Sequence, residues 1–237
     1  MLSRRYAEDD IIEAGVDEAG RGSFWGDLYA GAVIWPAEES WTDEIRALVP
    51  KIKDSKKISA KKREKIADDI KLLAADWCVG AVSSLEIDTN GIQWANQTAF
   101  HRALDGLQRL KPGRALIDGT LAITREDMQV VTIIDGDAQY LSIAAASILA
   151  KVEHDRWLQG RCEGEPTLIE RYDMLSCKGY GTARHRAGIE AYGLHPEHRR
   201  RFIRPSLHPD GLANPKRGRA LITDDEENCL ISINGKK

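Results

Sequence analysis

The stretch Gly15-Val-Asp-Glu-Ala-Gly-Arg-Gly-Ser-Phe-Trp-Gly-Asp-Leu-Tyr-Ala-Gly31 joins an apolar run to two acids, a glycine-rich turn and a second apolar run. Residues 11–16 are predicted to form a strand that ends at the acidic pair Asp17 and Glu18. The turn Gly20-Arg21-Gly22 follows, where glycine permits backbone conformations closed to other residues. Paired carboxylates beside an arginine and exposed backbone amides can serve metal ions and a phosphate backbone together. The stretch is therefore a candidate core for metal-dependent nuclease chemistry.

The acidic pair has a plainer explanation, because adjacent acids are common in surface turns. Neighbouring residues of a regular strand also point to opposite faces of the sheet. Asp17 and Glu18 can face one site only if the backbone leaves the strand at Glu18, which Gly20 and Gly22 would permit.

Strands and helices are expected to alternate along the rest of the chain, which predicts an α/β domain built around one sheet. The further strands are expected at residues 28–35, 77–85, 115–117 and 130–134. The helices are expected at residues 60–76, 86–110, 138–157 and 183–192, with a short last helix opened by Pro196. Residues 160–180 are expected to be irregular.

Acids also stand at the ends of two later strands, where α/β sheets commonly carry their sites. Asp118 precedes a glycine, which is an ordinary turn signal. Asp137 is well placed to cap the helix that follows it. Asp135 competes with Asp137 for a place in the site, and position alone does not separate the two.

Composition describes an ordinary globular chain of 237 residues, 42% hydrophobic and 30% charged, long enough for one domain or one domain with an appendage. The net charge of −3 hides basic segments at residues 51–65 and 184–204 and an acidic run at 224–227, a distribution that can steer a polyanion to one face. Its four cysteines are widely spaced and indicate neither zinc nor disulfides. Without a signal core or a long apolar run, a cytoplasmic protein with no membrane partner is expected.

Several other polar residues have ordinary structural explanations. Lys56, Lys57 and the run Arg199–Arg201 are expected to be solvated surface charge. His185, His195 and His198 are too dispersed to suggest a zinc site and are expected at the surface. Tyr180 lies between glycines, which either expose its ring or make it a structural turn tyrosine.

An ordered set of motifs resembles the ribonuclease HII branch of the type 2 ribonuclease H family over roughly residues 10 to 204. The motifs are Asp-Glu-Ala-Gly-Arg-Gly at 17–22, Asp-Ser-Lys-Lys-Ile-Ser at 54–59, Leu-Ile-Asp-Gly at 116–119, Gly-Asp at 136–137, Ala-Ala-Ser-Ile-Leu-Ala-Lys-Val at 145–152, Lys-Gly-Tyr-Gly-Thr at 178–182 and His-Arg-Arg at 198–200. Each motif is weak alone, whereas the ordered set is specific.

The resemblance implies a ribonuclease H-like mixed five-stranded sheet flanked by helices. It divides the chain into a catalytic domain at residues 1–160, a C-terminal helical substrate-binding extension at 161–204 and a flexible tail at 205–237. The catalytic and metal-binding residues it implies are Asp17, Glu18, Asp118 and Asp137, where Asp137 is chosen over Asp135 by the family pattern. The substrate contacts it implies are Gly20, Arg21, Gly22, Ser55, Lys56, Lys57, Lys178 and Tyr180.

The function implied is endonucleolytic cleavage of RNA in RNA–DNA hybrids and 5′ of single ribonucleotides in duplex DNA, for ribonucleotide removal in DNA replication and repair. The expected cofactor is two Mg²⁺ or Mn²⁺ ions, the substrates are the partners, and a monomer is expected. Two alternatives stay open: another nuclease of the same fold, such as a resolvase, and a non-catalytic nucleic-acid-binding module. Ser23 and Asp27, where the family usually has proline, and Cys177, where it has histidine, depart from the pattern and bear on the shape of the substrate cleft.

Overall fold

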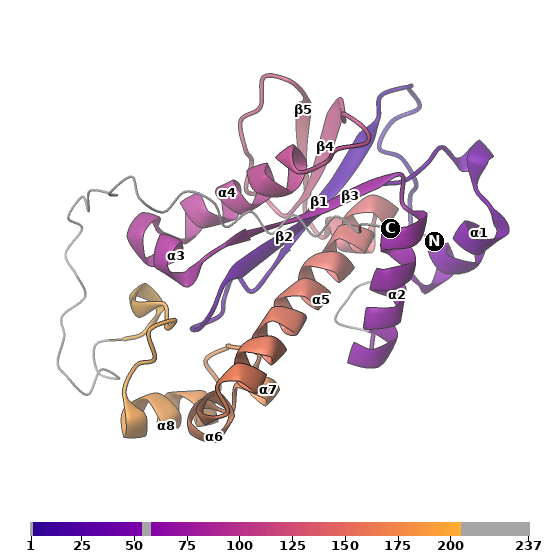
Figure 1. The fold of residues 1–237 in the computed structure, drawn as a ribbon. Coiled ribbons are helices and arrows are strands. Elements are labelled where there is room, and N and C mark those ends of the chain that lie inside the picture. The colour runs from indigo at the N-terminus through magenta and orange to yellow at the C-terminus, as the bar shows by residue number, and fades with distance from the viewer. Residues whose placement is uncertain (1, 54–57, 205–237) are drawn as a thin grey trace.

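A mixed five-stranded sheet forms the centre of the protein, in a computed structural model that describes residues 2–53 and 58–204. The strand order is β3-β2-β1-β4-β5 (Figure 1). The strands are β1 Glu13–Ala19, β2 Leu28–Ile34, β3 Asp76–Val82, β4 Arg114–Asp118 and β5 Gln129–Ile133. β1, β2 and β3 pair antiparallel, whereas β1, β4 and β5 pair parallel. The predicted fold class is confirmed.

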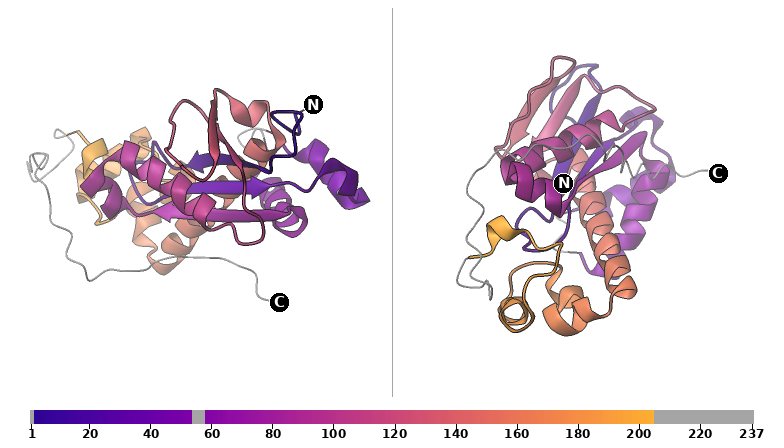
Figure 2. Two further views of the ribbon diagram at one scale, coloured as in Figure 1. Left: turned by 90° about the horizontal axis from the view of Figure 1, so that it is seen from above. Right: turned by 60° about the vertical axis from the view of Figure 1, so that its left-hand side comes forward.

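Helices cover both faces of this sheet (Figures 1 and 2). α5 (Leu141–Gly164) and α2 (Ala60–Leu73) close one face around one apolar cluster. α4 (Ile92–Asp105) closes the other face around a second cluster, with α3 (Ser84–Asn90) beside it. The other α-helices are α1 Asp43–Leu48, α6 Thr167–Tyr172, α7 Met174–Cys177 and α8 Ala183–Tyr192. Short 3₁₀ turns include Glu38–Ser40, Val49–Lys51, Gly136–Ala138 and Arg200–Phe202.

The long helix α5 lies directly against β1 and β2 because both strands carry glycine at the crossing. A Cβ added at Gly15 would lie 2.2 Å from the Ser142 backbone, and one added at Gly31 would lie 2.4 Å from the Ala146 carbonyl oxygen. Real Cβ atoms do not approach a backbone so closely, so a side chain at either position would force the helix away. The alanine-rich start of α5 completes this close contact from the helix side.

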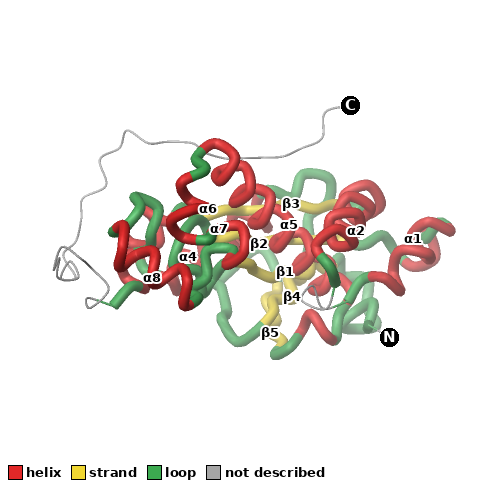
Figure 3. The backbone as a smooth tube through the Cα atoms, turned by 90° about the horizontal axis from the view of Figure 1, so that it is seen from below, coloured by secondary structure: helices red, strands yellow, loops and turns green. Residues whose placement is uncertain are grey.

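The C-terminal helices α6, α7 and α8 gather at the far end of α5, at the opposite end of the molecule from α1 (Figure 3). They share a third apolar cluster with the end of α5 and with Trp25. α5 continues to Gly164, through the predicted boundary between residues 160 and 161. The domain division stays a prediction, and its tail at 205–237 lies outside the described residues.

Several element predictions were wrong in extent. β1 does not stop before the acids but runs through both to Ala19. The helix expected at 86–110 is two helices, α3 and α4, separated at Gly91, whose φ is 90°. Residues 160–180 are largely helical rather than irregular. The short last helix begins at Arg200, not at Pro196.

No helix within the described ranges is both long enough and apolar enough to cross a membrane.

Candidate active site

Three of the predicted acids meet at one edge of the sheet. β1 and β4 run parallel, with Val16 opposite Ile117, so Asp17 and Asp118 occupy the next positions of the two neighbouring strands. Glu18 follows on β1, and Asp118 is the last residue of β4. The charge of Asp118 acts on both β1 acids, raising the pKa of each. The carboxyl end of the β1–β4 pair is therefore an acidic edge.

Asp17 and Glu18 belong to opposite faces of β1, as strand geometry requires. The carboxylate of Asp17 accepts hydrogen bonds from the Ser147 hydroxyl of α5 and, at 2.7 Å, from the amide of Glu18. Glu18 lies on the other side, beside Asn96 of α4. The expectation that the backbone leaves the strand at Glu18 was wrong, because the pair remains in the ladder opposite Gly31 and Ala30. The two acids instead flank the sheet edge from its two faces.

Burial and mutual repulsion both oppose ionisation of this pair. Asp17 is 6% exposed, and burial, with the charges of Glu18 and Asp118, raises its pKa well above the usual aspartate value. Burial likewise raises the pKa of Glu18, against which Arg21 acts from an ion pair at 3.6 Å. Asn96 also favours the charged form of Glu18, although neither atom of its buried amide completes a regular hydrogen bond with a described residue.

The fourth predicted acid, Asp137, lies in the 3₁₀ turn Gly136–Ala138 that follows β5. This turn is tied to Asp118, whose Oδ1 accepts a hydrogen bond of 2.7 Å from the Gly136 amide. Asp137 is half-buried, whereas Asp135 is exposed and left-handed, with φ at 53°. The prediction that Asp137 caps the following helix was wrong. That helix, α5, begins at Leu141 and has Tyr140 at its N-cap.

The donor chemistry of this edge fits a hard divalent cation, since the candidate ligands are carboxylate oxygens that repel one another. Within residues 2–53 and 58–204, however, no group of three or more histidine, cysteine or acidic side chains is already gathered to hold a metal ion. Asp17 and Asp118 instead point oxygens at the amides of Glu18 and Gly136.

The glycine-arginine-glycine turn lies directly beyond β1 and packs beside Tyr180. A Cβ added at Gly22 would lie 3.7 Å from Cε1 of Tyr180, and Ser23 and Tyr180 form an isolated β-bridge. Tyr180 is 39% exposed, and Nζ of Lys151 lies 5.9 Å from the centroid of its ring. The structure therefore brings together the two segments predicted to contact a ribonucleotide, although they are far apart in sequence.

Glycine is required in both segments of this contact. Gly20 has φ at 83°, and a Cβ there would lie 2.7 Å from Cδ2 of His154. Gly179 has φ at 79°, and a Cβ there would lie 2.7 Å from the carbonyl oxygen of Trp25. Glycine at position 20 therefore lets the turn lie against His154 of α5, and glycine at position 179 lets the Tyr180 loop lie against the Trp25 backbone.

Arg199 is a buried residue that the sequence reading placed wrongly in solvent. Its side chain is fully buried beneath the turn, where Nε donates to the Gly26 carbonyl at 2.7 Å and Nη1 to the Gly20 carbonyl at 2.7 Å and the Arg21 carbonyl at 3.1 Å. Burial lowers its pKa to about 10. No local pattern marks a buried arginine, because its partners lie more than 170 positions away.

The histidines expected at the surface were also placed wrongly. His185 and His198 are 0% and 1% exposed, and their Nε2 atoms lie 2.9 Å apart. His195 is partly buried, and its Nδ1 accepts a hydrogen bond of 3.0 Å from the Trp25 indole. Their separation in sequence disguised a cluster formed by the C-terminal helices.

Four further residues were predicted to contact the substrate. Ser55, Lys56 and Lys57 lie outside the described residues. Lys178 is half-buried and left-handed, with φ at 51°, immediately before Gly179.

The three departures from the family pattern have different surroundings. Ser23 is buried and its hydroxyl has no partner among the described residues. Oδ1 of Asp27 accepts a hydrogen bond of 3.0 Å from the Ser84 amide. Cys177 packs in the third apolar cluster, with its sulfur 3.7 Å from Nδ1 of His185.

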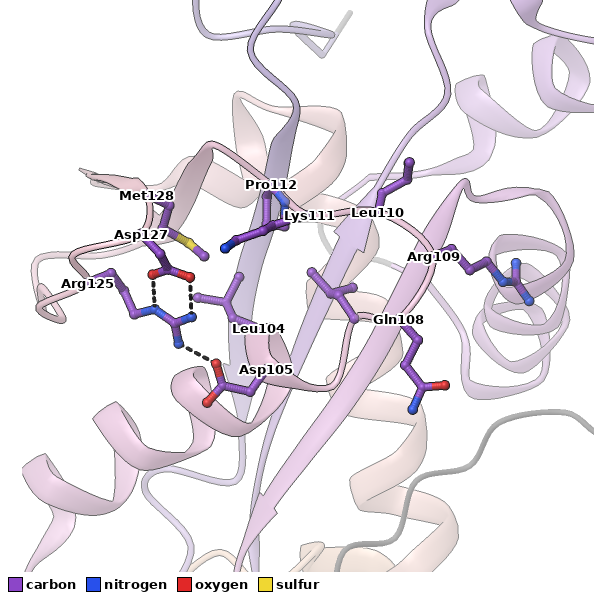
Figure 4. A pocket seen from close by; sticks show the side chains of 11 residues that line it. Leu104, Asp105, Gln108, Arg109, Leu110, Lys111, Pro112, Arg125, Asp127 and Met128 are labelled. Atoms are coloured by element: carbon purple, nitrogen blue, oxygen red, sulfur yellow. Dashed lines mark hydrogen bonds and ion pairs between the residues drawn. The ribbon is translucent and has the colours of Figure 1, made fainter.

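A hollow on the surface lies at the other end of the sheet and does not overlap the acids (Figure 4). Leu110, Lys111 and Pro112 line it just before β4 begins, whereas Asp118 closes that strand. Arg125 bridges Asp105 and Asp127 across the hollow. These three charges are thus paired with one another.

Comparison with known proteins places this chain among relatives. A sequence model of the family described as ribonuclease HII matches residues 14–207. A ribonuclease HII from Bacteroides thetaiotaomicron is 42% identical over 209 residues, covering 88% of this chain and 96% of its own.

Two solved structures share the fold. The ribonuclease H2 from Pyrococcus horikoshii has a TM-score of 0.65 and 28% identity, covering 80% of this chain and 92% of its own. The ribonuclease HII of Archaeoglobus fulgidus, solved in a complex with PCNA, has a TM-score of 0.63 and 28% identity, covering 81% and 93%. The chain therefore belongs to the ribonuclease HII family and is a nuclease that cuts RNA endonucleolytically within RNA–DNA hybrids.

Proposed function

We propose that this nuclease also cuts at a single ribonucleotide embedded in duplex DNA, on the 5′ side of that ribonucleotide, and leaves 5′-phosphate and 3′-hydroxyl ends. Such a reaction serves the removal of ribonucleotides from DNA during replication and repair. Its substrates are RNA–DNA hybrids and duplex DNA that contains ribonucleotides.

The contact between Gly22 and Tyr180 carries this proposal. One embedded ribonucleotide differs from its neighbours only by a 2′-hydroxyl, so its recognition requires groups that touch one sugar. No hydrogen bond is seen from the Arg21 or Gly22 amide to another described residue, and these donors suit the 2′-hydroxyl and the adjacent phosphate. The exposed ring of Tyr180 can stack on the next sugar, where a second 2′-hydroxyl would clash.

Asp17, Glu18, Asp118 and Asp137 are the proposed ligands of two divalent ions, Mg²⁺ or Mn²⁺. Burial and repulsion already disfavour the ionised acids at this edge, so the acids gain by holding cations. Divalent ions bound there supply activation of the attacking water and stabilisation of the leaving 3′ oxygen. Ser147 and the Glu18 amide orient Asp17, and the Gly136 amide orients Asp118. Lys56, Lys57 and Lys178 are proposed to hold phosphates, which predicts weaker binding as salt rises.

Cleavage of a duplex with one ribonucleotide, mapped at nucleotide resolution in Mg²⁺ and in Mn²⁺, tests the proposal. The wild type is expected to cut once, 5′ of the ribonucleotide. The variant Asp17→Asn is expected to cut more than about 100-fold more slowly, because even residues that only orient metal ligands contribute about 10–100-fold. Its affinity for the duplex should persist, because the Gly20–Gly22 turn, called the reading turn below, and Tyr180 are unchanged.

Two controls separate this function from its rivals. An all-DNA duplex should stay intact, whereas a resolvase of the same fold would cut it. A long RNA–DNA hybrid should be cut by the wild type. If the hybrid is cut and the single-ribonucleotide duplex is not, the enzyme is a hybrid nuclease only and the proposal fails.

A further inference from the structure

Two consecutive buried residues, His198 and Arg199, reach the two segments that are proposed to read the ribonucleotide. Arg199 binds the carbonyls of Gly20, Arg21 and Gly26 from below the turn. These three carbonyl oxygens, with the charge of Asp27 acting from beyond hydrogen-bond contact, compensate the buried charge of the guanidinium. The planar guanidinium of Arg199 binds both ends of the turn and so fixes the conformation of the turn. The amides of the turn can then face outward.

His198 reaches Tyr180 through a chain of hydrogen bonds. The His195 amide donates to Nδ1 of His198 at 2.7 Å, which places the His198 proton on Nε2. The same nitrogen lies farther, 3.3 Å, from the His195 carbonyl. His198 Nε2 then donates to Nε2 of His185 at 2.9 Å. The proton of His185 is thereby placed on Nδ1, which donates to the Tyr180 carbonyl at 3.0 Å.

This chain needs both imidazoles neutral, and their surroundings favour that state. Burial lowers the pKa of His198 to about 3 and also lowers the pKa of His185. Neutral rings leave one consistent assignment of donors and acceptors from the His195 amide to the Tyr180 carbonyl.

The backbone ties the same three segments together. The Arg199 amide donates to the Phe24 carbonyl at 2.7 Å, and His198 pairs with Trp25 in an isolated bridge. The Phe24 amide in turn donates to the Gly179 carbonyl at 2.8 Å. Residues 198–199 therefore stand between the turn and the Tyr180 loop and hold both.

We propose that His198 and Arg199 are positioning residues, which fix the Gly20–Gly22 turn relative to Tyr180 and so set selectivity for a single ribonucleotide without touching nucleic acid. The inference rests on the proposed reading of ribonucleotides by these segments. In a long hybrid every nucleotide of the RNA strand carries a 2′-hydroxyl. A Gly20–Gly22 turn that is held less rigidly can therefore still contact one in whichever register the hybrid binds. A single ribonucleotide offers one register, where a displacement of about 1 Å can cost about 100-fold.

Variants at each residue separate positioning from mere stability. Arg199→Lys keeps the charge but cannot span the three carbonyls. His198→Asn can still accept from the His195 amide but loses the donor to His185, whereas His198→Gln keeps a donor near the position of Nε2. Arg201→Lys is the matched control, because Arg201 is exposed and binds the Thr89 carbonyl away from the turn.

The measurement is kcat/KM on the single-ribonucleotide duplex divided by kcat/KM on a long hybrid, with thermal midpoints recorded for every variant. The ratio should fall at least about tenfold for Arg199→Lys and His198→Asn, recover in His198→Gln and stay unchanged in Arg201→Lys. Tyr180→Ala should give a fall of the same kind.

Unchanged ratios in folded Arg199→Lys and His198→Asn would overturn the inference while leaving the proposed function intact, provided that the wild type cuts the single-ribonucleotide duplex. If Arg199→Lys does not fold, the His198 pair decides alone. Equal losses on both substrates, with no recovery in His198→Gln, would show a purely structural role and also overturn it.

Discussion

Asp17 lies in surroundings that disfavour its ionised form. Burial and the charges of Glu18 and Asp118 raise its pKa. A group with a raised folded-state pKa contributes stability below its unfolded pKa, and that contribution is lost as pH rises through the folded value. We therefore expect Asp17→Asn to raise the free energy of unfolding by about 0.5–2 kcal/mol at pH 8 in EDTA, the range common for single stabilising substitutions.

Urea unfolding of the two proteins at pH 8 and at pH 3.5 measures this difference. The gain should shrink at pH 3.5, where the wild-type acid is protonated in the folded state and mostly protonated in the unfolded state. A variant less stable than the wild type at pH 8 would show that the hydrogen bonds of Asp17 outweigh its repulsion.

Asp27 offers a second acid whose ionisation opposes folding, and it lies apart from the acidic edge. Burial raises its pKa to about 6, although its carboxylate accepts the Ser84 amide. Stability should therefore fall as pH rises from about 4 to about 6, by up to about 2–3 kcal/mol, since each pKa unit corresponds to about 1.4 kcal/mol. Asp27→Asn keeps the acceptor for Ser84 and should flatten this fall. Unfolding curves between pH 4 and 7 that run parallel for both proteins would contradict the assignment.

At the scale of elements, the contact between α5 and the sheet decides how far the acids lie from the helix that orients them. Gly31→Ala would place a methyl group 2.4 Å from the Ala146 carbonyl oxygen, so helix and strand must separate. We expect a loss of about 1–3 kcal/mol of stability, as in other overpacked cores, and slower cleavage because Ser147 moves from Asp17.

Gly160→Ala is the matched control for this substitution. Gly160 lies on the exposed face of the same helix, with nothing within 4 Å of an added Cβ. Alanine should stabilise the helix there by about 0.5–1 kcal/mol. Equal thermal shifts from the two substitutions would show that the helix–sheet contact is not tight.

Elements with a strong period were predictable from sequence, and their ends were not. The apolar run of β2 and the alanine-rich start of α5 have patterns that survive in the fold. β1 was cut short because acids disfavour strands, whereas pairing with β2 holds Asp17 and Glu18 in the ladder. The break at Gly91 depends on one glycine with a positive φ inside an otherwise helical pattern.

At the scale of the whole molecule, the sequence could predict which acids lie at strand ends, but not which polar side chains are buried behind them. The strand-end position of Asp118 follows from local pattern, and its neighbour across the sheet is Asp17. His198 and Arg199 are buried by partners from distant segments, so their surroundings exist only in the folded chain. Long-range burial of polar side chains has no local period to reveal it.

The third apolar cluster joins the C-terminal helices to the catalytic sheet mainly through α5 and Trp25. Leu168 of α6 is fully buried there, and Leu168→Ala should cost about 2–5 kcal/mol. If residues 161–204 open as a unit of their own, amides in α6 and α8 should exchange at least about 30-fold faster, since about 1.4 kcal/mol is a factor of ten. Leu175→Ala, at a position 38% exposed, should change little.

Hydrogen exchange read segment by segment tests the predicted domain division, because amides of β1 and β4 should keep their protection in Leu168→Ala. The segment that opens includes His198 and Arg199, so the reading turn would lose its support while the acidic edge stays in place. Cleavage at single ribonucleotides should then fall more steeply than cleavage of long hybrids. Equal loss of protection in the sheet and in α6 would mean that the chain unfolds as one cooperative unit, with no boundary near residue 160.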